Sequence, residues 1–436
     1  MICLLPHCGY LSETSRMLVM QRALAARGAP VIVATQGGPH ERRLVEAGVD
    51  YHILGPRLSD VRCRELVQAG PGMGPLGQSM WSDEEIETYV RAEAQFFREH
   101  DVRVAVTGFT LTALLSTRLA GIPLIAEHAG SYVPPVWERK MTEPFLRSPL
   151  PLVDRLPYSA RRFIANIGID NVKHYCSGFN RVARKLGVEG VPSFASLLLG
   201  DLTLVPEAEE VLGIPAAELA AWRSSSRAYR AGARLEYVGP LFAELDLPVP
   251  ERVERFLEGP RPIVYVAVTS TTTEQIAAIV RALEPTGVRT LVAGTLHDLS
   301  ALQREHVLIE RVLPSHRIMP RVDLAITGGG QGSVQCALAS GTPLISLPLQ
   351  PEQDWNGQLV ERHGAGKRMS LKDAASSKLP ALVRHMLADE RYRIHARRIQ
   401  GIYARLDGPG SAAEAIMRYS GVGCVPPTAA GATALG

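Results

Sequence analysis

The sequence predicts an α/β protein with two doubly wound domains, each a parallel β-sheet covered by helices. Its 436 residues suit two domains of about 200 residues each. The chain opens with an apolar strand, a helix and a second apolar strand, and a similar alternation starts again at Ile263. A strand followed by a helix and another strand predicts a right-handed crossover, and therefore a parallel sheet.

Apolar runs bounded by turn residues predict the strands of both domains. In the first domain, strands are expected at Ile2–Leu5, Val31–Ala34, Tyr51–Ile53, Val102–Val106, Pro123–Ala126, Asp201–Val205 and Leu235–Val238. In the second domain, strands are expected at Ile263–Val268, Arg289–Ala293, Val307–Ile309, Leu324–Ile326 and Pro343–Leu347.

Helical periodicity, capping residues and helix-ending glycines predict the helices between these strands. Helices are expected at Thr14–Arg27, Ser82–His100, Thr110–Ala120, Glu274–Leu283, Ser333–Ser340, Leu379–Leu406 and Ser411–Tyr419. The glycine- and proline-rich segment Gly70–Gly77 is predicted to be a mobile loop. Gln350–Asn356 is predicted to be a polar loop, followed by a helix that ends near Gly364.

Composition divides the chain into domains and connecting segments. Residues 1–238 are expected to form the first domain and residues 263–405 the second. The segment 239–262 is rich in proline and charge, has no clear periodicity, and is predicted to be an interdomain linker. Residues 406–420 are expected to form a terminal helix, and residues 421–436, rich in Gly, Ala and Pro, a disordered tail.

Charge and cysteine content exclude several classes of protein. The net charge of +3 is too small to indicate nucleic-acid binding. Six cysteines without a C-x-x-C pair or metal-ligand spacing indicate reduced thiols, a cytoplasmic location and no metal site. No apolar run has the length of a membrane span. Met1–Leu5 leads directly into a strand, which argues against a signal peptide.

A glycine-rich turn in the second domain carries the strongest functional signal. The apolar strand Leu324–Ile326 is followed by Gly328, Gly329, Gly330 and Gly332, and then by a helix from Ser333. Glycine lets the backbone approach a ligand, and free N–H groups at a helix start point at an anion. The pattern therefore indicates a phosphate site, although a tight turn without a ligand would have the same glycines.

The stretch Leu324–Met369 resembles the donor-binding signature of the family-1 nucleotide-sugar glycosyltransferases, which have the two-domain GT-B fold of Rossmann-like domains. Bacterial members carry His-Gly-Gly-x-Gly-Ser/Thr, then Gly-x-Pro, then Pro-x-x-x-Asp/Glu-Gln-x-x-Asn. The matching runs here are Gly329-Gly330-Gln331-Gly332-Ser333, Gly341-Thr342-Pro343 and Pro348–Asn356. The resemblance implies that residues 1–238 bind the acceptor, that residues 263–405 bind the nucleotide sugar across a cleft, and that the last helix returns to the first domain.

The resemblance also implies roles for individual donor-site residues. The diphosphate is expected on the backbone of the glycine turn, without a metal, because N–H donors and the helix dipole replace a cation. The turn residues are Gly328, Gly329, Gly330, Gln331, Gly332 and Ser333. Glu352 and Gln353 are expected to bond sugar hydroxyls, Asn356 completes the motif, and Val312 marks the place of the nucleotide base. Ser270 and Thr271 are candidates for a second phosphate contact, although N-capping would explain them equally.

This chain departs from the family pattern where catalysis is expected. Gly328 replaces a histidine of the glycine motif, Tyr10 replaces the histidine that usually acts as the base, and Thr107 stands near the place of its orienting carboxylate. His7, on the same loop as Tyr10, is the best remaining base because a histidine pKa lies near neutrality. Tyr10 is a weaker candidate because its pKa is near 10. An acceptor that is a phenol, an amine or an activated carbon would need little help from a base.

Loops after parallel strands are expected to supply the acceptor pocket, because ligands bind at the carboxyl ends of such strands. The candidates are Thr107, Glu127, His128, Tyr132 and Trp137. Ordinary loop packing would explain each of them as well. The basic and aromatic segment Arg155–Gly187 is predicted to form a lobe over this pocket.

These observations favour an inverting glycosyltransferase that moves a sugar from a dTDP- or UDP-sugar to a small natural-product acceptor, as in antibiotic biosynthesis, with no cofactor beyond the co-substrate. The alternatives are a catalytically inactive GT-B protein that binds nucleotide sugar, and a sugar-nucleotide epimerase of similar fold. The family's ribose-binding glutamate falls on Cys336, and a thiol cannot hold two hydroxyls. A dTDP donor is therefore favoured over UDP, unless Gln335 turns inward. A homodimer is left open.

Overall fold

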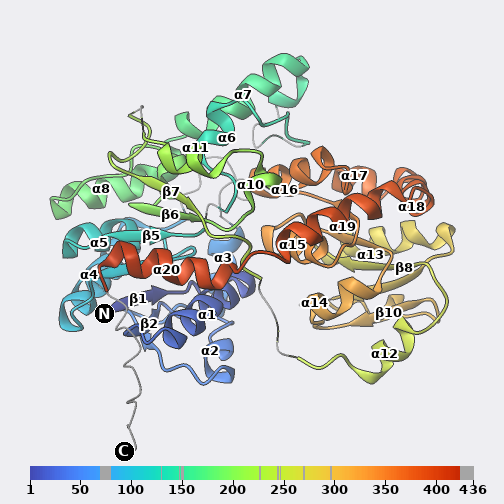
Figure 1. Ribbon diagram of the computed structural model, residues 1–436, viewed down its shortest axis with the longest axis horizontal. Helices are drawn as coiled ribbons and strands as arrows, with labels where there is room; N and C mark the ends of the chain where they lie inside the picture. Colours follow the sequence, from blue (N-terminus) through green and yellow to red (C-terminus); the bar gives the residue numbers. More distant parts are fainter. Residues whose placement is uncertain are drawn as a thin grey trace, which may run out of the picture.

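The computed structural model describes residues 1–68, 80–128, 130–146, 148, 152–224, 227–242, 245, 247–268, 271–294 and 297–422. Figure 1 shows two helix-covered sheets side by side, the first built from the blue to green part of the chain and the second from the yellow to red part. The expected loop Gly70–Gly77, Ser270 and nearly all of the expected tail lie outside the described residues.

The first sheet has seven strands, all parallel, in the order β3-β2-β1-β4-β5-β6-β7. Its strands are β1 (Ile2–Leu5), β2 (Val31–Thr35), β3 (His52–Ile53), β4 (Val104–Thr107), β5 (Leu124–Ala126), β6 (Leu202–Val205) and β7 (Arg234–Tyr237). The strand order reverses between β1 and β4, where Leu5 is paired with Thr107. The loops that follow these two strands therefore separate and leave a crevice at the switch point.

The second sheet repeats this plan with six parallel strands in the order β10-β9-β8-β11-β12-β13. Its strands are β8 (Ile263–Ala267), β9 (Arg289–Ala293), β10 (Val307–Glu310), β11 (Leu324–Thr327), β12 (Leu344–Ser346) and β13 (Gly366–Arg368). The switch point lies between β8 and β11, where Ala267 is paired with Thr327. The predicted fold class, two doubly wound parallel sheets, is confirmed.

Helices cover both sheets. Those of the first half are α1 (Leu11–Ala26), α2 (Arg42–Glu46), α3 (Asp60–Gln68), α4 (Asp83–Glu99), α5 (Ala113–Ala120), α6 (Pro134–Glu138), α7 (Tyr158–Asn171), α8 (Ser177–Leu186), α9 (Phe194–Leu197), α10 (Glu209–Leu212) and α11 (Ala216–Ala221). Those of the second half are α12 (Glu251–Leu257), α13 (Thr273–Leu283), α14 (Ser315–Ile318), α15 (Gln331–Ala339), α16 (Pro351–Arg362), α17 (Leu371–Ala374), α18 (Lys378–Ala388), α19 (Arg391–Tyr403) and α20 (Gly408–Ser420).

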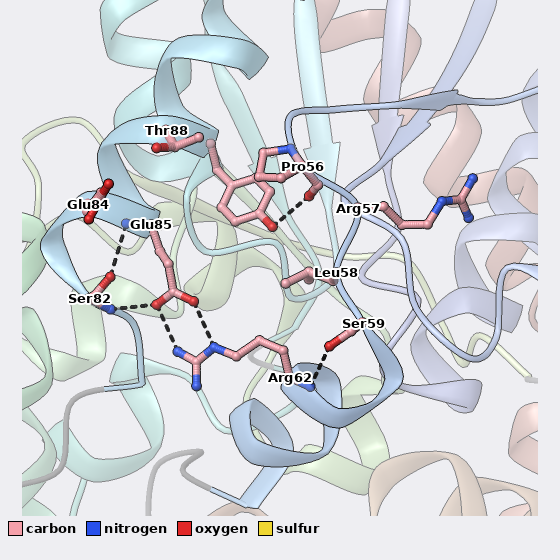
Figure 2. Close-up of a pocket in the computed structure, with 10 residues that line it drawn as sticks. Pro56, Arg57, Leu58, Ser59, Arg62, Ser82, Glu84, Glu85 and Thr88 are labelled. Atoms are coloured by element: carbon pink, nitrogen blue, oxygen red, sulfur yellow. Dashed lines mark hydrogen bonds and ion pairs between the residues drawn. The ribbon is translucent and has the colours of Figure 1, made fainter.

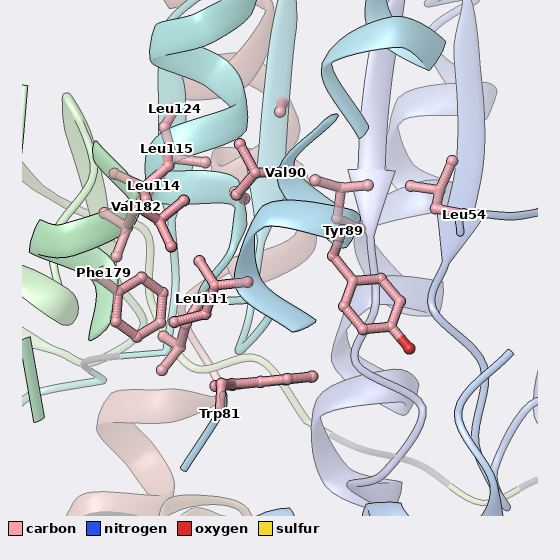
Figure 3. Packing of buried hydrophobic residues seen from close by; sticks show 14 of the residues in the cluster. Leu54, Trp81, Tyr89, Val90, Leu111, Leu114, Leu115, Leu124, Phe179 and Val182 are labelled. Carbon is pink, nitrogen blue, oxygen red and sulfur yellow. The ribbon is translucent and has the colours of Figure 1, made fainter. Parts of the chain in front are cut away.

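The long helix α4 shows how local sequence and packing agree. Ser82 caps its N-terminus by accepting a hydrogen bond from the Glu85 N–H, and Glu85 bonds back to the Ser82 N–H. Its buried face packs on α5 and on the sheet. Figure 3 shows Tyr89 and Val90 of α4 in a core with Leu111 and Leu114.

Two predicted segments differ from the structure. Gln350–Asn356 was expected as a loop, but α16 begins at Pro351, a residue that is tolerated in a first helical turn. The polar side chains of this segment are buried in contacts with both domains, for example Asn356 with Gly329 and Asp354 with Leu146. The single helix expected over Leu379–Leu406 is divided at Asp389, which is extended and accepts a hydrogen bond from the Arg391 N–H.

The segments between and after the two sheets also carry structure. Within the segment expected as a linker, α12 packs Val253, Phe256 and Leu257 into a core of the second sheet. The last helix, α20, lies beside α1 of the first domain in Figure 1 and buries Ile416 in the core that contains β1. Among the described residues, no helix is both long enough and apolar enough to cross a bilayer.

A buried carboxyl group lies inside the first domain. Glu93 of α4 is fully buried and accepts hydrogen bonds from Gln36 Nε2 at 2.7 Å, Thr112 Oγ1 at 2.6 Å and Ser116 Oγ at 2.6 Å. Burial raises the pKa of Glu93 to about 7, although these hydrogen bonds oppose the rise. Between pH values of about 4.3 and 7, Glu93 is therefore protonated in the folded state and ionised in the unfolded state.

We expect Glu93→Gln to flatten the dependence of stability on pH. Because the folded pKa is raised, the contribution of Glu93 is fully present below its unfolded pKa and is lost as the pH rises towards 7, by on the order of 3 kcal/mol. Urea unfolding at several pH values measures the slope, and the difference between wild type and variant isolates Glu93. Parallel curves for the two proteins would contradict this account.

Candidate functional site

The glycine turn after β11 leaves no room for side chains on one side and is open on the other. Gly329 has a φ of +80°, and a Cβ atom there would lie 2.3 Å from Ser346 Oγ and 2.8 Å from the Gln353 carbonyl oxygen. A Cβ atom at Gly328 or Gly330 would meet nothing within 4 Å. Gly330 is the extended N-cap residue of α15. The first N–H groups of α15 therefore start at a turn with open space beside it, as anion binding requires.

Helix α16 holds this turn in place through side-chain hydrogen bonds. Asn356 Nδ2 donates to the Gly329 carbonyl at 3.0 Å and to Glu352 Oε1 at 2.5 Å. Gln353 Oε1 accepts from the Leu349 N–H at 2.8 Å, which ties the start of α16 to the loop before it. Burial raises the pKa of Glu352, while Asn356 and Arg16 oppose the rise. The three motif residues of α16 thus lie together at the glycine turn.

The same region contacts the first domain. Gln331 Nε2 donates to the Pro206 carbonyl at 3.3 Å, and Leu146 donates its N–H to Asp354 Oδ2 at 2.7 Å. The rings of Tyr132 and Trp355 lie 6.0 Å apart across the interface. The glycine turn therefore lies beside the interface between the two domains.

Of the residues expected to contact the phosphate and the base, Thr271 and Val312 lie within the described residues. Thr271 Oγ1 donates to Gln275 Oε1, and Thr272 caps α13 by accepting from the Gln275 N–H at 3.3 Å. Val312 is half-buried in the loop between β10 and α14. The N-capping alternative thus describes Thr272, and nucleotide contacts from Thr271 and Val312 stay predictions.

Gln335, next to the half-buried Cys336, bonds residues outside the glycine turn. Gln335 is buried, and its Nε2 donates to the Pro206 carbonyl and, at 3.5 Å, to Glu207 Oε2. Glu207 also accepts from Tyr403 Oη at 2.7 Å. Gln335 therefore belongs to a contact between the domains.

His7 is buried in the loop after β1. Its Nδ1 accepts a hydrogen bond from the Gly9 N–H at 3.2 Å, so the neutral ring carries its proton on Nε2. Burial lowers the pKa of His7 to about 4. The ring centroid of Tyr10 lies 5.4 Å from that of His7 and 5.1 Å from that of Phe109. His7, Tyr10 and Phe109 therefore form an aromatic cluster at the first switch point.

The other acceptor candidates lie in three different environments. The His128 ring lies 5.6 Å from Phe109 and extends the aromatic cluster, with Nε2 bonded to the Leu197 carbonyl at 2.9 Å. Tyr132 and Trp137 are packed inside a core, and Trp137 Nε1 donates to Asp170 Oδ1 at 2.9 Å. Thr107 is buried, and its hydroxyl bonds the backbone around it. Acceptor contacts from these residues stay predictions.

Glu13, in the first turn of α1, was not predicted from the sequence as a site residue. Its Oε2 accepts from the His7 N–H at 2.8 Å and its Oε1 from the Phe109 N–H at 3.2 Å, so one carboxylate joins the loops after β1 and β4. Burial raises the pKa of Glu13 to about 8, and Arg16 opposes the rise. An acidic residue in a first helical turn ordinarily indicates only a favourable dipole contact, so the sequence carries no signal for this role.

Arg16, one turn further along α1, lies among carboxylates from three elements. Its Nε bonds Glu127 at 2.9 Å in a buried ion pair, and it also attracts Glu13 and Glu352. Glu352 belongs to the donor-side helix α16. The charged cluster Glu13, Arg16, Glu127 and Glu352 therefore spans the two domains.

Two cavities lie away from the glycine turn. Figure 2 shows the first, of about 350 Å³, between the loop after β3 and α4. Its Arg62 and Glu85 bond each other at 2.7 and 2.8 Å, and Tyr89 Oη donates to the Pro56 carbonyl. The second, of about 400 Å³, lies between β7 and α20. Arg62, Glu85 and Tyr89 are thus engaged within the protein, and the glycine turn remains the better candidate for a ligand site.

Comparison with known proteins points to glycosyltransferases. Residues 275–414 match the family described as erythromycin biosynthesis protein CIII-like, C-terminal domain. The chain is 30% identical over 164 residues to 4'-demethylrebeccamycin synthase of Lentzea aerocolonigenes, covering 37% of this chain and 39% of that protein. It is 26% identical over 333 residues to a PGL/p-HBAD biosynthesis glycosyltransferase of Mycobacterium tuberculosis, covering 74% of this chain and 72% of that protein.

Solved structures agree over nearly the whole chain. The glycosyltransferase VinC in complex with dTDP superposes with a TM-score of 0.64 at 15% identity, covering 97% of this chain and all (100%) of that one. Spinosyn forosaminyltransferase gives a TM-score of 0.64 at 13% identity, covering 96% of this chain and 99% of that one. With the two parallel sheets, these likenesses confirm the GT-B fold.

We expect Gly330→Val to abolish nucleotide binding in a folded protein. The backbone of Gly330 is in a region open to any residue, and the added side chain would fill the space where a phosphate is expected. Calorimetry with dTDP and with UDP should show a loss of about a hundredfold or more in affinity, with an unchanged melting temperature. Gly401→Val on α19, where a Cβ atom also meets nothing, is the control. Wild-type affinity in the Gly330→Val variant would show that the diphosphate does not bind at this turn.

Proposed function

Because the chain belongs to the family-1 glycosyltransferases of GT-B fold, we propose that it transfers a sugar from a nucleotide diphosphate to a small-molecule acceptor. The observation that carries this proposal is the glycine turn at the start of α15. It lies beside the interface between the two domains, it is open on one side, and Glu352 lies beside it. Transfer of radiolabelled sugar from dTDP- or UDP-glucose to an organic-soluble product tests the activity.

The proposed reaction needs charge stabilisation at the leaving diphosphate. The N–H groups at the start of α15 and the dipole of that helix supply it without a divalent cation. An acceptor bound on the first domain would approach the sugar from the side opposite the diphosphate, so a single displacement would invert the configuration at C1. Turnover that persists in excess EDTA, with a product of inverted configuration, is the expected result.

The acceptor is proposed to be a natural product, as in antibiotic biosynthesis. The relatives of this chain include 4'-demethylrebeccamycin synthase and a demethyllactenocin mycarosyltransferase, which supports this class for the present chain. A cytoplasmic location is proposed because the cysteines of the described residues form no disulfide.

A catalytically inactive nucleotide-sugar-binding protein is the alternative. Tyr10 and Thr107 stand where the family places its catalytic histidine and near its orienting carboxylate, which favours this alternative if no other base exists. Binding of dTDP without any transfer or donor hydrolysis would support it. The sequence-derived candidate for the base, His7, remains a prediction.

The donor is proposed to be a dTDP-sugar. Cys336 stands where a glutamate would hold both ribose hydroxyls, and the Gln335 amide is turned to the Pro206 carbonyl. A 2′-deoxyribose has one hydroxyl fewer to satisfy, so it loses less from the missing carboxylate. The structural neighbour VinC was solved in complex with dTDP, which supports this choice.

We therefore expect dTDP to bind at least as tightly as UDP, because neither Cys336 nor Gln335 offers a carboxylate to a ribose 2′-hydroxyl. Competition of the two nucleotides for the same site, measured by calorimetry, decides the matter. Cys336→Glu should shift the preference towards UDP. A tenfold preference of the wild type for UDP, about 1.4 kcal/mol, would show that another residue binds the ribose.

A further inference from the structure

We propose that Glu13 is the general base of this transfer and that the acceptor is an aromatic compound carrying a hydroxyl group. The inference rests on the proposed glycosyltransferase function and deepens it. It follows from the position of one carboxylate, which the loops that carry the aromatic cluster of the first domain hold at the start of α1.

The Glu13 carboxylate is held in place from two sides. The His7 N–H reaches Oε2 and the Phe109 N–H reaches Oε1, and each oxygen keeps a second lone pair. A Cβ atom at Gly108 would lie 2.2 Å from Glu13 Oε1. The glycine after β4 thus leaves the space that Glu13 enters from α1. A positioned carboxylate with free lone pairs can accept a proton from a bound hydroxyl.

The first turn of α1 also contacts the donor side. The neighbouring Ser12 lies 3.8 Å from the position of a Cβ atom at Gly332 in α15. Arg16 interacts with Glu13 and also attracts Glu352 on α16. The first turn of α1, which carries Glu13, therefore lies close to the helix start where the diphosphate is proposed to bind.

The charged groups around Glu13 suit a base that works near neutral pH. Arg16 favours the ionised carboxylate and Glu127 disfavours it, while burial is the largest effect and raises the pKa to about 8. Tyr10 and Cys8, which also face Glu13, have raised pKa values and stay neutral. A base whose pKa lies near the working pH accepts a proton most effectively.

The aromatic cluster indicates what the acceptor is. Tyr10 and Phe109 are partly exposed, lie edge to face at 5.1 Å, and adjoin His7 and His128. Such rings bind flat aromatic molecules by stacking and edge contacts. A hydroxyl on a ring bound there would lie beside the loops whose N–H groups hold Glu13.

Transfer to the acceptor hydroxyl is a single displacement. A lone pair of the acceptor oxygen attacks C1 of the sugar while Glu13 takes the hydroxyl proton. The bond between C1 and the diphosphate oxygen breaks, and its electron pair leaves with the nucleoside diphosphate. Glu13 then releases the proton to water. His7 fits this role less well, because its Nδ1 lone pair is engaged by Gly9 and its Nε2 carries a proton.

The test compares two phenols with dTDP-glucose as donor. 4-Nitrophenol is largely ionised in mildly alkaline buffer and needs no base, whereas 4-methoxyphenol is neutral and needs one. We expect Glu13→Gln to lower transfer to 4-methoxyphenol by about a hundredfold or more and to change transfer to 4-nitrophenol by only a few fold, with dTDP affinity unchanged. Glu93→Gln changes a buried carboxyl group that bonds Gln36, Thr112 and Ser116 and neither His7 nor Phe109. It is the matched control and should leave both rates unchanged.

The pH profile gives a second readout. With 4-methoxyphenol, the wild-type kcat/KM should rise with pH and level off near a pKa of about 8, and the Glu13→Gln variant should lose this rise. Equal losses with both phenols would mean that Glu13 only holds the loops. Selective loss in His7→Ala instead would make His7 the base. Either result overturns the proposal.

Two further outcomes distinguish failure of the aromatic-acceptor proposal from failure of the proposed glycosyltransferase function. A wild type that binds dTDP but transfers to neither phenol would overturn the aromatic acceptor class. A wild type that binds neither dTDP nor UDP would overturn the proposed function itself.

Discussion

The contact between the glycine turn and helix α16 is the constraint on which the rest of the site depends. Gly329 lies so close to the Gln353 carbonyl and Ser346 that no side chain fits, and Asn356 bonds its carbonyl oxygen. This contact fixes the direction in which α15 begins. It also places Glu352 beside the first N–H groups of that helix. A small shift of α16 would therefore displace the proposed phosphate site and the proposed sugar contact together.

The interface between the domains is unusually rich in buried ionisable groups. Arg16 is shared by Glu13, Glu127 and Glu352, so one cation serves three carboxylates. Burial raises the pKa of each carboxyl group, and Arg16 opposes the rise. Charges in such a poorly hydrated site interact more strongly than at the surface.

The sequence predicted what depends on local chemistry. Buried apolar runs marked strands such as β1 and β11, and the glycine spacing marked the turn before α15. Prediction from the sequence failed where tertiary contacts determine the structure. The first turn of α16 is polar because Asp354 and Asn356 are buried in hydrogen bonds to other segments, and the prediction treated that polarity as exposure. Glu13 escaped notice because its two partners come from loops that meet only when β1 and β4 pair.

A crystal structure with bound dTDP tests the central claim most directly. We expect the β-phosphate oxygens to lie about 3 Å from backbone N–H groups between Gly330 and Ser333, with the leaving oxygen facing Glu13 across the cleft. A nucleotide bound elsewhere, for example in the cavity beside Arg62 and Glu85 (Figure 2), would contradict this claim.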